Sequence, residues 1–220
     1  MNIRSVTPKA VTPKVGASKA EPPPGRRADL AQHLIDTAIS LFAERTYEGT
    51  QMPAVAQRAQ VGVGTIYRYF PSKEALGNAA FRYAKRGLLD EYLAALAEGG
   101  AAGSAREEFG RLWRASVRYA TAHHDAFVFL EHQQHDTFLD PASQALAGEI
   151  DAFAADFISR GQQSGELREG EPQLLISLVL GAFAGLLKHL RPAGLGALSP
   201  AELARAEQAV WALLHREART

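Results

Sequence analysis

Small, hydroxyl-bearing and cationic side chains alternate with apolar ones over residues 63–70, VGTIYRYF. A helix over this segment advances by about 100° per residue. Four residues then share its outer face: Gly64, Thr65, Tyr67 and Arg68. On such a face, guanidinium and hydroxyl groups can contact phosphates and base edges, an aromatic ring can contact thymine methyls or sugar, and a glycine permits close approach. This combination predicts contact with the major groove of DNA.

The elements that must position this face are two short helices joined by a tight turn. The first helix is predicted over 52–59 and the second from Val63. The inner face of the second helix is apolar and comprises Val63, Ile66 and Phe70. The turn between the helices is residues 60–62, where we expect Gly62 to adopt backbone angles that other residues resist. This is the layout of a DNA-binding helix-turn-helix.

Helix start and stop signals flank the motif. Pro53 falls in the first turn of the first helix, where a missing N–H costs little. Pro71 ends the second helix, and Ser72 is expected to cap a further helix that begins at Lys73.

Residues 27–76 resemble the DNA-binding domain of the TetR (tetracycline-repressor-like) family of bacterial transcription regulators. The matching stretches are AISLFAERTYEGTQ, VAQRAQVGVGTIYRYF and PSKEAL. In that family, residues around the second helix of the motif and a lysine of the next helix touch DNA. Carried onto this sequence, those positions are Gly62, Val63, Thr65, Tyr67, Tyr69 and Lys73.

The chain departs from the family pattern at three positions. Gln51 stands where Ser or Thr usually caps the first helix of the motif, Gln60 replaces the usual turn glycine, and Gly62 replaces the usual hydroxyl cap of the second. These departures remove hydroxyls that normally contact phosphates, and we expect Gln51 to reach the DNA backbone instead. The complete set of predicted DNA contacts is Gln51, Gly62, Val63, Gly64, Thr65, Tyr67, Arg68, Tyr69 and Lys73.

Charge is divided unevenly along the 220 residues, although the formal net charge is +0. Residues 1–86 hold 13 Lys and Arg against 6 Asp and Glu, whereas residues 87–220 hold 11 against 18. The basic half contains the helix-turn-helix, so DNA is attracted to that end and repelled from the other. Cysteine is absent, which excludes disulfides and thiolate metal sites and fits a cytoplasmic location.

Periodicity predicts an all-α protein of about nine helices in two domains. We expect a disordered tail with Pro and Lys over 1–25, the helix-turn-helix domain over 26–72, and a helical ligand-binding and dimerisation domain over 73–220. The tail repeats VTPKA as VTPKV, and its basic residues could reach phosphates or stay in solvent. In the last domain, helices are predicted over 73–98, 104–122, 124–134, 140–164, 172–190 and 200–217.

The segment 174–187, LLISLVLGAFAGLL, is apolar almost all round. Its 14 residues are too few for a membrane span, which needs about 20. Gly181 and Gly185 lie one turn apart on one face, where another backbone could approach. With Val210, Trp211, Leu213 and Leu214 of the last helix, this segment resembles the family's dimer interface, a four-helix bundle with two helices from each subunit. Internal core is the alternative.

Aromatic side chains at helical spacing in the middle of the second domain suggest an effector pocket. We expect its lining to include Trp113, Phe127, Phe153 and Phe157, with His132 orienting the ligand. The same spacing is also typical of plain core. Few charges are expected inside, so the predicted effector is a small hydrophobic or aromatic molecule.

Histidines and aspartates gather over 123–136, HHDAFVFLEHQQHD. The cluster from His123 to His135 could form a metal site, a polar rim of the pocket or plain surface. No phosphate loop, serine elbow or HExxH motif is present, so we expect no enzyme, catalytic residue or cofactor. The sequence therefore predicts a homodimeric repressor on a palindromic double-stranded DNA operator, released by a small-molecule effector. A metal-sensing regulator, or a metal-dependent helical protein that uses the His123–His135 cluster, is the alternative. An activator, or a regulator without a ligand, is a third.

Overall fold

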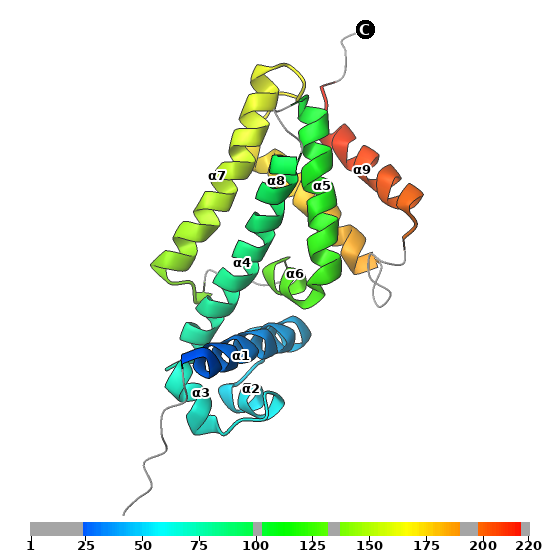
Figure 1. The fold of residues 1–220 in the computed structure, drawn as a ribbon. Helices are drawn as coiled ribbons and strands as arrows, with labels where there is room; N and C mark the ends of the chain where they lie inside the picture. The colour runs from blue at the N-terminus through cyan, green and yellow to red at the C-terminus, as the bar shows by residue number, and fades with distance from the viewer. Residues whose placement is uncertain (1–23, 99–102, 132–136, 190–197, 217–220) are drawn as a thin grey trace, which may run out of the picture.

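The computed structural model describes residues 24–98, 103–131, 137–189 and 198–216. Over these ranges the chain forms nine helices and no strand (Figure 1). The helices are α1 (Pro24–Arg45), α2 (Met52–Arg58), α3 (Val63–Tyr69), α4 (Lys73–Glu98), α5 (Ala105–Ala122), α6 (His124–Glu131), α7 (Pro141–Gln163), α8 (Pro172–His189) and α9 (Pro200–Leu214). The all-α prediction is confirmed, and the predicted tail, 1–25, falls almost entirely outside the described residues.

The sequence signals for helix starts act as predicted. Ser104 and Glu107 form a capping box at α5, and Ser199 and Glu202 form another at α9, so each box satisfies two backbone N–H groups that have no helical partner. Asp140 accepts from the backbone N–H of the third residue of α7. These local bonds explain why the predicted starts agree with the observed ones to within a residue.

The first three helices enclose a core that positions α3. Phe42 of α1, Val55 of α2 and Ile66 of α3 are all fully or almost fully buried and belong to one apolar cluster. The turn differs from our expectation, because the residue with left-handed backbone angles is Gln60 (φ 57°) and not Gly62 (φ −69°, ψ 144°). Gly62 instead adopts the extended conformation that is usual for the residue preceding a helix.

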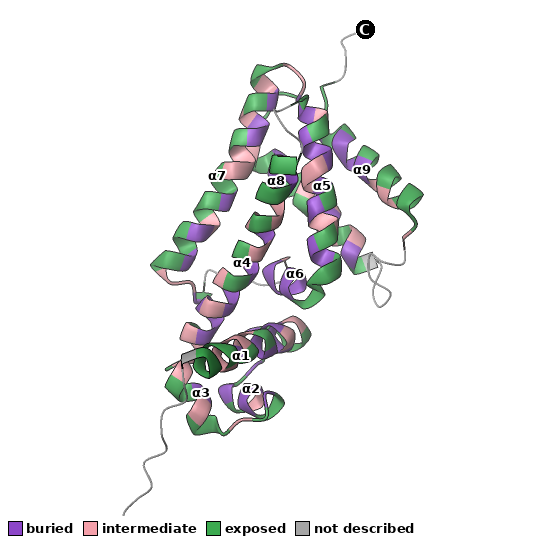
Figure 2. Cartoon of the chain, viewed as in Figure 1, coloured by how far each residue is buried: buried purple, intermediate pink, exposed green. Residues whose placement is uncertain are grey.

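The remaining helices form a second layer around α4 (Figure 1). α4 packs against α1 near its start and against α5 and α7 further along, while α8 packs against α7 and α9, and α9 also packs against α5. Short α6 lies between α1 and this layer and is buried on nearly all sides (Figure 2). The last helix ends at Leu214, before the predicted residue 217, because His215 pairs with Leu167 in an isolated antiparallel bridge.

Candidate nucleic-acid interface and effector cavity

The outer face of α3 is open to solvent. Tyr67 is 46% exposed, and Gly62, Gly64 and Arg68 are exposed around it, whereas Ile66 is fully buried and fixes the helix to the core. A Cβ built at Gly64 would have no neighbour within 4 Å, so this position offers space for close approach. Thr65 is half-buried beside them. The outer-face residues that the sequence predicted to contact DNA therefore lie together on one open face of α3.

The position of Val63 on the helical wheel predicted that it lies on the inner face of α3, and this prediction is wrong. Val63 is 43% exposed, and Phe70 is only partly buried, so Ile66 is the one fully buried side chain of α3. Val63 is the first residue of α3 and lies ahead of the turn that packs into the core. This exposure suits the contact role implied by the family resemblance. Gln51 is also exposed, and its side chain makes no capping hydrogen bond to α2.

The two remaining predicted contacts are held by neighbouring groups. The guanidinium of Arg27 lies 5.8 Å from the centre of the Tyr69 ring. The ammonium of Lys73 lies 4.3 Å from the centre of the Tyr47 ring and donates to the backbone oxygen of Glu48 at 3.3 Å. Tyr47 was not identified from the sequence, because nothing in the local pattern shows that its ring would lie under a lysine 26 positions later.

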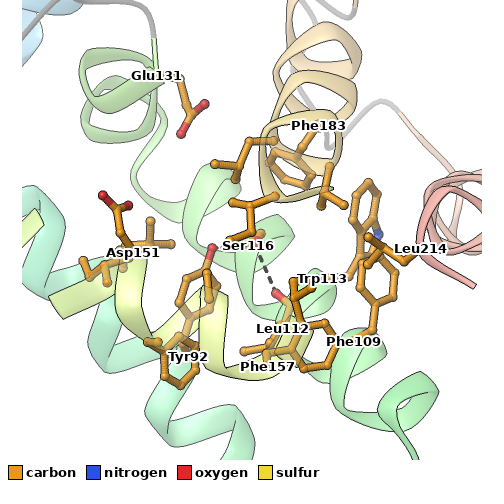
Figure 3. Close-up of a pocket in the computed structure, with 18 of the residues that line it drawn as sticks. Tyr92, Phe109, Leu112, Trp113, Ser116, Glu131, Asp151, Phe157, Phe183 and Leu214 are labelled. Carbon is orange, nitrogen blue, oxygen red and sulfur yellow. Dashed lines mark hydrogen bonds between the residues drawn. The ribbon is translucent and has the colours of Figure 1, made fainter. Parts of the chain in front are cut away.

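The second domain contains a cavity of about 150 Å³ between α4, α5, α6, α7 and α8 (Figure 3). Four of the predicted ligand contacts line it together: Trp113, Phe127, Phe153 and Phe157. Phe109, Phe183 and Leu214 add further apolar surface. The fifth predicted contact, His132, lies outside the described residues. Aromatic spacing alone could not distinguish this lining from solid core.

Polar groups line one side of this cavity, contrary to our expectation of little charge. The hydroxyls of Tyr92 and Ser116 are 3.0 Å apart, and Ser116 also donates to the backbone oxygen of Leu112 at 3.0 Å. In Figure 3, Glu131 and Asp151 lie on the same side as Tyr92, away from Trp113 and Leu214. Lys85 also lines the cavity. A ligand there would meet a mostly apolar wall and one polar end.

Burial controls the ionisation of these groups. It raises the pKa of the Glu131 carboxyl above its usual range, and the charge of Lys85 opposes this only in part. Burial likewise raises the pKa of Tyr92 to about 12, so its hydroxyl stays protonated near neutral pH. The indole N–H of Trp113 is buried and has no hydrogen-bond partner among the described residues. Unsatisfied buried donors are uncommon, and a bound ligand could accept from this one.

Other buried acids in this domain are paired and do not belong to the cavity. Glu108 of α5 accepts two hydrogen bonds from Arg160 of α7, at 2.9 and 3.0 Å. Glu207 of α9 lies 2.8 Å from Arg106 and 3.2 Å from Arg114. These pairs connect α5 to α7 and α9. Glu131 remains as a half-buried acid with no ion pair to a described residue.

The outer face of α8 carries an exposed apolar stripe. Leu174 is 58% and Leu178 47% exposed, and a Cβ at Gly181 or Gly185 would have nothing within 4 Å. The predicted interface residues of α9 need correction, since their side chains are buried in their own chain: Val210, Trp211 and Leu214. Trp211 packs against Phe109 of α5 at 5.4 Å between ring centres, so this face of α9 is core.

The histidine cluster forms no metal site within the described part of the chain, where no three candidate ligands come together. His123 caps the end of α5 and lies 5.0 Å, ring centre to ring centre, from Tyr119. His132, His135 and Asp136 lie outside the described residues. None of the described helices is long and apolar enough to cross a membrane.

Comparison with known proteins shows which family this chain resembles. A family described as "Bacterial regulatory proteins, tetR family" matches residues 34–80, and one described as "Tetracyclin repressor-like, C-terminal domain" matches residues 89–215. The "HTH-type transcriptional repressor KstR" of Rhodococcus jostii is 52% identical over 42 residues, which are 19% of this chain and 20% of that protein. This chain thus aligns with only about a fifth of that relative's length.

Longer alignments are weaker in identity. The "Fatty acid metabolism regulator protein" of Bacillus subtilis is 24% identical over 140 residues, 62% of this chain and 70% of that protein. The crystal structure of a TetR family transcription regulator from Marinobacter aquaeolei has a TM-score of 0.75 at 19% identity, covering 88% of this chain and 99% of that one. At this identity, the structural likeness shows the fold.

The raised pKa of Glu131 predicts a pH dependence of stability. In the window between its unfolded pKa, near 4.5, and its higher folded pKa, the native state binds more protons than the unfolded state, so stability falls as pH rises. Glu131→Gln should remove this fall and stabilise the protein above the window. Urea midpoints at pH 5 and pH 7.5 measure it, with Glu149→Gln, an exposed site on α7, as control. An equal fall in both variants would contradict the assignment.

Proposed function

Because this chain belongs to the TetR family of bacterial regulators, and is therefore a DNA-binding regulator and not an enzyme, we propose that it is a dimeric repressor released from its operator by a small apolar effector. The observation that carries this proposal is the open outer face of α3, with Tyr67 and Arg68 exposed on a helix fixed by Ile66. Repression in the cytoplasm, where the chromosome lies, is part of the proposal. The repressor names of the relatives support it.

The proposed operator is palindromic. Two copies of α3, related by a two-fold axis, would enter successive major grooves about 34–36 Å apart. The stripe of Leu174, Leu178, Gly181 and Gly185 on α8 is the surface proposed to pair the subunits. The two glycines permit another helix to approach closely. The exposed leucines supply apolar surface that stays in water unless a partner covers it. Exposed Leu213 extends this surface onto α9, in place of the three residues that the core buries.

Effector binding would change the spacing of the two α3 helices through α4. This helix starts directly after α3 and contributes Leu88 and Tyr92 to the cavity lining. A ligand can shift the equilibrium only by its differential affinity for the two conformations, so the cavity must be better formed in the DNA-free state.

The proposed effector is a largely apolar molecule with one polar end. Aromatic rings and aliphatic side chains form most of the lining, and the polar groups gather around Tyr92, Ser116 and Glu131. The B. subtilis relative is named for fatty acid metabolism, which supports an apolar ligand class without identifying it.

Tyr67→Ala tests the DNA interface. Loss of the exposed ring should weaken specific operator binding by about 1–3 kcal/mol while leaving the fold intact. The operator is first selected from a random duplex pool, and affinity is measured by fluorescence anisotropy. Tyr83→Ala is the matched control, because Tyr83 is 45% exposed but lies on α4. Equal affinities of the parent and the Tyr67 variant would exclude α3 as the reading helix.

Gly185→Leu tests the subunit interface. The free chain has room for the new side chain, so any effect must come from a partner, and we expect monomers with much lower operator affinity. Gly148→Leu is the control, since Gly148 is also helical, exposed and open, but on α7. Sedimentation velocity measures the assembly. A dimer that persists in the Gly185 variant would move the interface elsewhere.

Ala154→Phe tests the cavity. A ring added to its lining should occupy the ligand space, so the variant should bind operator but no longer respond to an effector. Lipophilic and aromatic compounds are screened for operator release, with tryptophan fluorescence as the binding signal, and Ala142→Phe on the exposed side of α7 is the control. Release by zinc or nickel that persists in Ala154→Phe would support the metal-sensing alternative instead.

A further inference from the structure

Lys73 is held against an aromatic ring at the edge of the DNA-binding unit. Its ammonium lies 4.3 Å from the centre of the Tyr47 ring and donates to the backbone oxygen of Glu48 at 3.3 Å. Lysine has three N–H donors and this carbonyl uses one, so donors remain for a phosphate. Lys73 is the first residue of α4 and follows the end of α3 by only four residues. A fixed cation at this position loses less side-chain freedom on binding DNA.

The Tyr47 ring is itself held by a residue of the second domain. Phe138 stacks on it at 3.9 Å between ring centres, with an angle of 19° between the planes. Stacking fills one face of the ring, so the ammonium must occupy the other. Gly77 of α4 lies against both rings, and a Cβ there would come within 2.7 Å of Tyr47 and 3.0 Å of Phe138. The space around the pair is therefore full.

The backbone at Phe138 is tied to α4. Asn78 donates from its side chain to the Phe138 backbone oxygen at 2.8 Å and accepts from the backbone N–H of Asp140, also at 2.8 Å. Arg82 then donates to the Asp140 carboxylate at 2.9 Å and to Ser143 at 2.8 Å. Asp140 and Ser143 belong to the start of α7, the helix that carries Phe153 and Phe157 into the cavity lining.

We infer that Tyr47 and Phe138 are positioning residues for Lys73, so that a side chain from the effector domain determines how well the α4 lysine contacts a DNA phosphate. This inference rests on the proposed DNA-binding function. Phe138 holds the ring, the ring holds the ammonium, and loss of the stack lets the lysine move away from its contact position. Burial raises the pKa of Tyr47 to about 12, so the ring stays neutral and its face remains available to the cation.

A double-mutant cycle on the full-length protein and its selected operator tests this inference. Lys73→Met should weaken binding and lower the salt slope by about 0.9 per subunit, the value for one phosphate contact. Phe138→Leu keeps an apolar side chain but removes the stack, and should weaken binding by about tenfold or less. The double variant should bind as Lys73→Met does, because the stack has no effect once the ammonium is gone.

Arg68→Ala provides the control cycle. Arg68 is exposed on α3, a different helix from the one that carries Lys73, so the effects of its loss and of the Phe138 change on affinity should multiply. Multiplication in both cycles would overturn the inference, as would an unchanged affinity of Phe138→Leu. Circular dichroism melts check folding, and Tyr47→Leu, which removes the ring from the other side, serves if Phe138→Leu does not fold. A parent protein that selects no duplex would refute the proposed function instead.

Discussion

One helix, α4, packs in both the DNA-binding domain and the second domain, and the rest of the structure depends on this constraint. The first half of α4 buries Leu76, Ala80 and Phe81 in the core around α1, and its second half contributes Leu88 and Tyr92 to the cavity. Its 26 residues span about 39 Å, at 1.5 Å per residue. Close-packed interiors do not deform smoothly, so a change at one end of such a helix is passed to the other as a tilt or a shift.

Contacts between the two domains restrict which movements are available. Buried α6 places Phe129 of the second domain 5.4 Å, ring centre to ring centre, from Phe42 of α1. The Phe138 ring makes a second contact, by stacking on Tyr47, and Asn78 of α4 holds the Phe138 backbone in place. The DNA-binding unit is therefore packed against the effector domain at two places besides α4. In the proposed function, a change at the cavity could reach the DNA-binding unit through α6 and α7 as well as through α4.

The parts of the fold that the sequence predicted are those determined locally. Capping boxes, prolines and helical periodicity depend on residues three or four positions apart, and they placed the helix starts, Ile66 inside and Tyr67 outside. The errors arose where distant segments decide. The sequence shows that α9 has an apolar face, formed by Val210, Trp211 and Leu214. That this face belongs to the core, and not to a subunit interface, depends on the position of α5. The polar side of the cavity required Tyr92, Ser116 and Glu131 to meet from three helices. The turn is a local error of a different kind, because Gln60 and not Gly62 takes the left-handed angles.

The small volume of the cavity bears on what an effector must do to enter. About 150 Å³ accommodates a molecule the size of benzene, whereas a lipid chain or a fused ring system needs several times more space. In the proposed function, a ligand of that size would gain further apolar contact by separating α7 and α8 from α4 and α5, and its affinity would be reduced by the packing that it disrupts. The length and bulk of the effector, more than its functional groups, would then determine how far the helices separate. In the proposed function, such a regulator would respond to the size of its effector, and compounds too small to expand the cavity would bind without releasing the operator.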